Sequence, residues 1–297
     1  MKKIMVLVLC LVCTLPVFAT DLIDMTRAGN TEGAKKAIQG GADVNAVDAD
    51  GMTAFAYAIV SKIENPDQDY EILELLLKAG VDINQEFEGY GNEIMTPLSF
   101  SFMAELDFAV SDEDVLNTRY DVAIWLIKHG ADANNVRIDG FPIFYVPVMT
   151  GSPEILALMI SSGLRVNARS EEGYNALSFL LSQYEYASDE FTMTEGHYEV
   201  FRQLVKAGLD VNAWDEDGMN ALLYAARSLD AKMVRFLLES GADAKLFNPD
   251  GESAFDYAKS NNALINTDEY WLLCDAHYEA IDNHMNTIQP YIIMGFY

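Results

Sequence analysis

The chain has 297 residues, of which 46 are acidic and 19 are basic, so its formal net charge at pH 7 is −27. A surface this negative repels nucleic acid and anionic lipid, which excludes both as binding partners and leaves basic proteins and cations. The alternative is that the charge only keeps the surface solvated. With 51% hydrophobic residues, a chain of this length can bury a substantial core.

Residues 1–19 have the pattern of a secretory signal peptide. Lys2 and Lys3 precede an apolar run from Ile4 to Leu15, and the segment closes on the small residue Ala19. A run of about twelve residues is short for a membrane span, which needs about twenty. The sequence therefore predicts cleavage after Ala19, no stable membrane insertion of the mature protein, and a periplasmic or secreted location.

A five-residue phrase of the type Gly-Ala-Asp-Val-Asn recurs along the rest of the chain. Two of the five intervals between the last residues of successive phrases are 33, and the other three are longer. A phrase repeated at this spacing predicts a stack of similar repeats, each too small to bury its own core. The six phrases are Gly41–Asn45, Gly80–Asn84, Gly130–Asn134, Gly163–Asn167, Gly208–Asn212 and Gly241–Lys245.

Each phrase stands between two predicted helices. Apolar residues such as Leu73, Leu76 and Leu77 precede the phrase at the spacing of one helical face, and the phrase glycine suits the end of that helix. An acid–Gly turn follows the phrase, then a residue able to cap a short apolar helix. The predicted capping residues are Thr53, Thr96, Asn175, Asn220 and Ser253.

These repeats resemble ankyrin repeats, and Met95-Thr96-Pro97-Leu98 is the stretch most similar to the family's helix-start motif. The resemblance covers about Asp21 to His277 and implies an all-α solenoid of about seven helix-turn-helix repeats with hairpin turns. The chain departs from the family because the motif's histidine is absent throughout, which bears on stability more than on function. Pro142 and Ile143 replace Thr-Pro in the fourth repeat, so its first helix is expected to start differently. The histidine position holds Ala56, Ser99, Tyr145, Ser178, Leu223 and Asp256.

Extra residues collect between the two helices of three repeats, in segments rich in acids. Insertions on one side of a repeat array are often binding loops, although loops also lengthen at little cost. None has the ligand spacing of a calcium loop. The segments are Ser61–Asp69, Ala104–Asn117 and Gln183–His197, with a further enlargement of the hairpin at Glu86–Met95.

The predicted domain boundaries are a signal peptide at 1–19, a repeat domain at 20–283 and an apolar tail at 284–297. The tail is expected to fold back over the last repeat, with docking on another chain as the alternative. Two of the three cysteines lie in the signal segment, so the mature chain keeps only Cys274 and forms no intramolecular disulfide. Its apolar neighbours predict a buried thiol.

A search for catalytic chemistry predicts none. His277 and His284 are seven residues apart and could share a helix face, but no third zinc ligand follows at a familiar spacing. His129 stands at a predicted helix end. Nucleophile elbows, phosphate loops and His-Glu-x-x-His motifs are absent from the sequence. We therefore expect a non-enzymatic, monomeric chain without cofactor or metal.

The ankyrin resemblance implies binding through the hairpin tips and the exposed sides of the first helices. The residue after each turn glycine is expected to project there, flanked by acids at the tips, which suits a basic protein partner. The alternative is that the methionines pack on adjacent hairpins and the acids only form turns. Other open functions are a secreted protein that engages a host or neighbouring cell, an acidic cation-binding protein, and an enzyme with an unrecognised site. The predicted binding residues are Met52, Phe141, Tyr174, Met219, Trp214, Asp50, Asp139, Glu172 and Asp217.

Overall fold

The computed structural model describes residues 17–88, 94–103, 113–138, 140–186 and 193–294. Helices dominate this part of the chain, and its strands are two residues long. The chain divides into two compact halves, Met1–Asp132 and Ala133–Tyr297, which are taken one at a time below.

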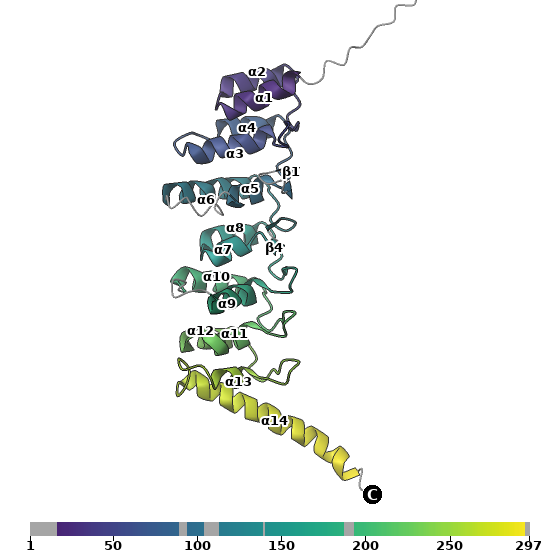
Figure 1. Cartoon of the computed structure of the whole chain (residues 1–297), viewed down its shortest axis with the longest axis vertical. Helices are drawn as coiled ribbons and strands as arrows, with labels where there is room; N and C mark the ends of the chain where they lie inside the picture. Colours follow the sequence, from purple (N-terminus) through teal and green to yellow (C-terminus); the bar gives the residue numbers. More distant parts are fainter. Residues whose placement is uncertain (1–16, 89–93, 104–112, 139, 187–192, 295–297) are drawn as a thin grey trace, which may run out of the picture. The chain divides into compact units, whose positions relative to one another are not determined.

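The N-terminal half contains three helical pairs and one two-stranded ribbon (Figure 1). Strands β1 and β2 pair antiparallel, with Phe87 opposite Met95. The elements are α1 (Val17–Arg27), α2 (Thr31–Gln39), α3 (Ala54–Glu64), α4 (Glu71–Lys78), β1 (Phe87–Glu88), β2 (Ile94–Met95), α5 (Pro97–Met103) and α6 (Glu113–Lys128).

The C-terminal half contains four helical pairs and a second ribbon, in which Ile138 lies opposite Phe141. Its last helix, at 27 residues, is by far the longest. The elements are β3 (Arg137–Ile138), β4 (Phe141–Pro142), α7 (Tyr145–Met149), α8 (Pro153–Ser161), α9 (Ala176–Tyr186), α10 (Glu195–Lys206), α11 (Ala221–Ser228), α12 (Ala231–Glu239), α13 (Ala254–Ala258) and α14 (Asp268–Met294).

Within each half, first helices stack on first helices and second helices on second helices. In the N-terminal half α1 contacts α3, α3 contacts α5, and α2 contacts α4; in the C-terminal half α7, α9, α11 and α13 form one row. The hairpin turns project from the same edge of each stack (Figure 1). The seven helical pairs of the described chain confirm the prediction of an all-α ankyrin-type solenoid with about seven repeats.

The predicted helix ends are confirmed. The glycines that open the six phrases have φ angles between +87° and +100°, a left-handed conformation that costs glycine little. At the helix starts, the Thr53 hydroxyl accepts from the Ala56 amide at 3.1 Å and the Asn220 side chain accepts from the Leu223 amide at 3.0 Å. Helix α7, which follows Pro142, is five residues long and lacks a side-chain cap, as the substituted motif predicted.

Three of the residues that occupy the family's histidine position take over part of the capping. The hydroxyls of Ser99 and Ser178 accept from the amides of Thr96 and Asn175 at 2.9 and 3.0 Å. The Asp256 carboxylate accepts from the Ser253 amide at 2.8 Å. Each helix start thus gains a bond that runs back to its capping residue, which compensates for the missing histidine.

The last residue of the repeated phrase explains why that phrase recurs. The Asn167 side-chain oxygen accepts from the Asp210 backbone amide at 2.8 Å, and the Asn167 side-chain nitrogen donates to the Gly208 backbone carbonyl at 2.8 Å. Both partners belong to the next repeat. Asn84, Asn134 and Asn212 make the same pair of bonds one repeat onward, whereas only the first of the two is seen for Asn45. These asparagines therefore link consecutive repeats within each half.

The final phrase ends in Lys245 instead of asparagine, and this change coincides with the last helix. The Lys245 ammonium pairs with Glu279 of α14 at 2.7 Å. Arg235 of α12 pairs with Glu269, and the His277 Nδ1 lies 2.7 Å from the Ser253 hydroxyl. Helix α14 is thus fixed to the last repeat by ionic and polar contacts along one face.

The course of α14 corrects the expectation of a tail that folds back. The backbone is one helix from Asp268 to Met294, so the chain does not reverse after Asn283. No glycine lies between Asn283 and Met294, and the helix continues through Pro290. Residues 295–297 lie outside the described chain.

The N-terminal helix α1 begins at Val17 and therefore runs across the predicted cleavage point at Ala19. Residues 1–16, which carry most of the predicted signal peptide, lie outside the described chain, so the signal stays a prediction. Among the helices that the structure describes, none is long and apolar enough to cross a membrane.

The insertions lie between first and second helices, as predicted. The first lengthens α3 and is closed by Lys62, a buried lysine whose ammonium donates to the carbonyls of Pro66, at 2.6 Å, and Gln68. The third insertion ends in a capping box, in which the Thr194 amide donates to the His197 Nδ1 at 3.1 Å. Residues 89–93, 104–112 and 187–192 of the enlarged segments lie outside the described chain.

Candidate protein-binding surface

Three of the hairpins that the structure describes in full begin with a side chain that holds the turn together. In the turn Asp215–Met219, the Asp215 carboxylate accepts from the Met219 amide at 2.8 Å. The Asp215 amide donates in return to the Met219 carbonyl, at 2.9 Å. Asp48 and Asn248 hold the equivalent turns through the same two types of bond.

A tyrosine nine residues further on, in the first helix, completes this arrangement. The second oxygen of Asp215 accepts from the Tyr224 hydroxyl at 2.9 Å, and Asp48 accepts from Tyr57 at 2.8 Å. In the last repeat the Asn248 amide donates to Tyr257 at 3.3 Å. These pairs were not predicted from the sequence, although their common spacing of nine residues is visible in it. They position the hairpin against the first helix.

The two side chains that hold the Asp215 turn are buried. Asp215 is 8% exposed and Tyr224 is 2% exposed. Burial, together with the nearby Asp217 charge, raises the pKa of the Asp215 carboxyl, whereas its hydrogen bonds lower it. Burial and the bond to Asp215 raise the pKa of Tyr224 far above that of an ordinary tyrosine.

A cluster of four aromatic rings lies on the hairpin side of the C-terminal half, and we call it the aromatic cluster. Phe141 of β4 and Phe179 of α9 have ring centroids 4.5 Å apart, and Tyr145 lies 5.2 Å from Phe179. Tyr174, at the next hairpin, lies 6.3 Å from Phe179. Phe141, Tyr174 and Phe179 are partly exposed, whereas Tyr145 is buried and donates to the Tyr174 carbonyl at 2.6 Å.

Carboxylates edge this cluster. The Tyr174 hydroxyl donates to Asp217 at 3.2 Å, and both Asp217 and Glu172 are exposed. Burial is the main cause that raises the pKa of Tyr174, and the charges of Asp217 and Asp215 add to it. The predicted residues Phe141, Tyr174, Glu172 and Asp217 are therefore found on or beside one cluster.

Two arginines on the same side tie each hairpin to the next. The Arg137 guanidinium donates to the carbonyls of Gly140 and Arg169 at 2.6 and 3.0 Å. Arg169 donates in the same way to the carbonyls of Gly173 and Trp214. The sequence analysis did not single out these arginines. Their charges make the rim of the aromatic cluster mixed instead of purely acidic.

Two predicted contact residues are placed differently from the expectation. Met52 and Met219 are 4% and 5% exposed, so their side chains pack inward at the hairpins instead of projecting to a partner. Both residues also close their turns, because the amides of Asp48 and Asp215 donate to their carbonyls at 3.0 and 2.9 Å. The alternative that these methionines pack between hairpins describes them correctly.

The remaining predicted residues, Asp50 and Trp214, differ in their exposure to solvent. Asp50, at the tip of the N-terminal hairpin, is exposed and donates its amide to the Asp48 side chain at 2.9 Å. Trp214 is partly buried, and its carbonyl accepts from Arg169. Asp139 lies outside the described residues. Asp50 belongs to the N-terminal half and Asp217 to the C-terminal half.

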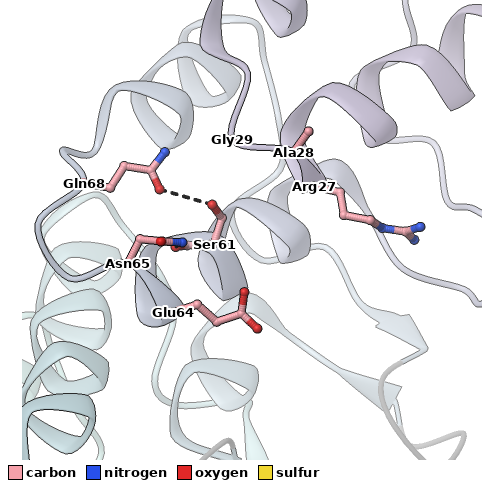
Figure 2. A pocket seen from close by; sticks show the side chains of 7 residues that line it. All are labelled: Arg27, Ala28, Gly29, Ser61, Glu64, Asn65 and Gln68. Atoms are coloured by element: carbon pink, nitrogen blue, oxygen red, sulfur yellow. Dashed lines mark hydrogen bonds between the residues drawn. The ribbon is translucent and has the colours of Figure 1, made fainter.

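A polar pocket of about 370 Å³ lies in the N-terminal half (Figure 2). It is lined by the end of α1, at Arg27–Gly29, and by Ser61, Glu64, Asn65 and Gln68. Figure 2 shows the Ser61 hydroxyl bonded to the Gln68 amide oxygen, at 3.1 Å. None of the predicted hairpin-tip residues lines this pocket, but Ser61, Glu64, Asn65 and Gln68 belong to the insertion Ser61–Asp69.

Metal ligation was also considered. Within the residues that the structure describes, no three His, Cys, Asp or Glu side chains converge as a metal site would require. His277 contacts Ser253 and Asp256, while the His284 side chain lies outside the described part. Cys274 is a free, half-buried thiol.

Comparison with known proteins supports the fold. Residues 204–258 match the family model of ankyrin repeats in many copies. The ankyrin repeat domain of human ASB11 aligns over 86% of this chain and 97% of its own, at 17% identity and a TM-score of 0.52. The domain of Bcl-3 aligns over 83% and 96%, at 18% identity and a TM-score of 0.55. A domain from Acinetobacter baumannii AYE aligns over 74% and 97%, at 20% identity and a TM-score of 0.53.

No curated protein matches the sequence significantly. Ankyrin repeats in general are non-catalytic scaffolds for protein–protein interaction. The chain therefore has the ankyrin-repeat fold, and its residues 204–258 match the ankyrin-repeat family in sequence as well.

Proposed function

We propose that this chain is a non-catalytic scaffold that holds a protein partner on the aromatic cluster of its C-terminal half. The observation that carries the proposal is the position of Phe141 and Tyr174, two partly exposed rings at the hairpin side that both contact the partly exposed ring of Phe179. Aromatic side chains presented on a rigid element are the usual anchors of protein interfaces.

We propose further that the partner is basic. The support is the net charge of −27, together with exposed acids at the hairpin tips of both halves: Asp50 in one, Glu172 and Asp217 in the other. Arg137 and Arg169 reduce this effect near the aromatic cluster, so the charge acts chiefly by attracting the partner and the rings by anchoring it.

A capture experiment tests this function. The bait is the chain from Thr20 to Tyr297, compared with the double variant F141S/Y174S and with L272S, which removes an apolar side chain that is 51% exposed and lies outside the aromatic cluster. We expect the wild-type and L272S baits to capture a basic protein that stays bound at moderate salt, and F141S/Y174S to lose it. Capture that F141S/Y174S retains, while its thermal melting is unchanged, would contradict the proposed site.

We also propose that the chain is exported, to the periplasm or beyond the cell. The support is the sequence of residues 1–19, in which Lys2 and Lys3 precede an apolar run that ends near Ala19. The intact mass of the protein recovered from envelope and culture-fluid fractions decides this point. A mass that begins at Thr20 is expected, whereas an unprocessed chain in the cell interior would contradict export.

A further inference from the structure

One face of the last helix packs on the last repeat, and the adjoining face is largely exposed. Leu273 and Glu269 are buried, and the rings of Tyr270 and His277 contact Phe255 of α13. On the adjoining face Trp271 is 53% exposed and Tyr278 is 58% exposed, and the Tyr278 ring also lies 6.2 Å from the Phe255 ring. Large aromatic side chains with this much exposure on one helix face are unusual unless that face binds something.

The exposed face has the spacing of a coiled-coil seam. Trp271, Cys274, Tyr278 and Ile281 follow one another at intervals of three, four and three residues. Ile281 is also exposed, at 37%, and Cys274 is half-buried. The sequence continues the same intervals with Met285, Ile288 and Ile292, and the backbone is helical as far as Met294. Apolar residues that alternate at three and four are the a and d positions of a heptad.

The length of the helix supports the same interpretation. Helix α14 has 27 residues, whereas α12, against which it packs, has nine. At 1.5 Å per residue, α14 is about 40 Å long, far longer than the last repeat requires. Among the described elements, α12 and α13 are the ones that make substantial contact with α14.

The charges beside the seam indicate what kind of helix covers it. Asp275 and Asp282 each follow a seam aromatic by four residues, which is the e position of the heptad. Both are exposed, and within the described chain neither forms an ion pair, whereas Glu279 is paired with Lys245. From Asp268 to the last residue the sequence has no lysine or arginine.

These observations disfavour a second copy of this chain as the occupant. An antiparallel pair of α14 helices would bring the e-position acids Asp275 and Asp282 against their counterparts, and each copy carries a charge of −27. A parallel pair would bring these acids toward g positions such as His277, which is already bonded to Ser253 within the last repeat. A partner helix with apolar a and d residues and with lysine or arginine at e and g satisfies both the seam and the acids.

We propose that the seam Trp271–Ile281 of α14 docks a basic amphipathic helix of a partner protein as a two-helix coiled coil. This site is separate from the aromatic cluster of the proposed function. It also binds in a different way, because the partner presents an apolar stripe of a helix flanked by positively charged side chains.

The test uses two designed peptides of about four heptads, with isoleucine at a and leucine at d. One carries lysine at e and g, and the matched control carries glutamate there. Fluorescence anisotropy of the labelled peptides measures binding to the full chain. We expect the lysine peptide to bind and the glutamate peptide to bind at least about tenfold more weakly.

Variants of the chain locate the binding. W271A/Y278A is expected to weaken binding of the lysine peptide by about tenfold or more, and D275K/D282K is expected to reverse the preference toward the glutamate peptide. F141S/Y174S is expected to leave binding of the lysine peptide unchanged, which separates this site from the aromatic cluster of the proposed function. If the alanine variant melts early, D275K/D282K still decides, because it retains every apolar side chain.

Three results would overturn the inference. One is lysine-peptide binding that W271A/Y278A does not alter, since the peptide would then act as a general counterion. Another is that neither peptide binds. The third is a doubled mass of the wild-type chain in sedimentation, lost in W271A/Y278A and accompanied by a Cys274–Cys274 cross-link under mild oxidation, which would identify a second copy as the occupant.

Discussion

The turns that begin at Asp48 and Asp215 have the same backbone bonds but different surroundings. Each aspartate accepts from a turn amide and from a tyrosine nine residues later. Asp48, with a side chain 14% exposed, also pairs with Arg27 of α1 at 3.1 Å. Asp215 is buried beside the acidic Asp217 and has no ion-pair partner among the described residues. One turn scaffold therefore supports both a charge-neutralised hairpin and an acidic one.

This difference shows which residues determine the charge and polarity of each hairpin surface. The turn-holding side chain is fixed by the fold, whereas the residues around it are free to change. At the N-terminal hairpin the neighbour is a cation, which also lies over the Tyr57 ring at 4.1 Å. At the C-terminal hairpin the neighbours are the acids and the rings of the aromatic cluster, so that hairpin is the better candidate for a partner.

The largest expected effect comes from removing the buried aspartate. Asp215→Ala deletes the acceptor of both the Met219 amide and the Tyr224 hydroxyl, and leaves a buried phenol without its acceptor. We expect unfolding free energy to fall by about 2–4 kcal/mol, against about 1–2 kcal/mol for Asp48→Ala at the more exposed turn. Guanidinium unfolding of the two variants measures the difference.

Asp215→Asn is the matched control for this prediction. Asparagine already holds the equivalent turn of the last repeat, where Asn248 accepts from the Glu252 amide at 2.8 Å. The asparagine variant is therefore expected to lose little stability. Equal losses for the alanine variants of Asp48 and Asp215 would show that burial does not distinguish the two turns.

The second effect appears at alkaline pH. In the folded state the pKa of Tyr224 is raised far above its ordinary value of about 10, so above pH 10 the unfolded chain releases a proton that the folded chain keeps. The stability contributed by this tyrosine is thus complete below about pH 10 and is lost as the pH rises above it, by about 1.4 kcal/mol per pH unit.

Unfolding free energies measured from about pH 8 to about pH 11 test this sign. Tyr224→Phe is expected to make the alkaline decline shallower by about one proton. Tyr57→Phe should change it less, because Arg27 lowers the pKa of Tyr57 against the raising effects of burial and Asp48. An unchanged slope in Tyr224→Phe would mean that the phenol is not held as the structure shows.

The comparison also shows which features were predictable from sequence. Capping residues such as Thr53 and Asn220 and the phrase glycines were predictable because each acts on its own local backbone. The Asp215–Tyr224 pair was missed because it joins a turn to a helix, and a search limited to neighbouring positions overlooks such a pair. The repeated spacing of nine residues would have revealed it.

Burial was the harder property to predict. Met52 and Met219 each follow a turn glycine in sequence, and their side chains are buried. Phe141 and Tyr174, at the same position of other repeats, are partly exposed and contact large neighbouring rings. Glu252 is exposed, although its turn has the same backbone bond as the turns of Met52 and Met219. Exposure at this position thus depends on side chains contributed by an adjacent helix or hairpin.

The smallest expected effect comes from removing the ion pair at the N-terminal turn. Arg27→Ala removes the cation beside Asp48, which makes the N-terminal turn resemble the C-terminal one. The Arg27 side chain is 50% exposed, so water screens the ion pair, and the loss of unfolding free energy should not exceed about 1 kcal/mol. The difference between wild type and variant should shrink further at high salt.

A matched control for this last prediction is Lys78→Ala, which breaks an exposed pair with Glu74 at 3.1 Å that supports no turn. Arg27 differs because its guanidinium also donates to Tyr57 and covers that ring. We therefore expect Arg27→Ala to retain a small destabilisation at high salt, where Lys78→Ala retains none. A salt-independent loss well above 1 kcal/mol would instead show that α1 holds the first hairpin in place by packing and not by charge.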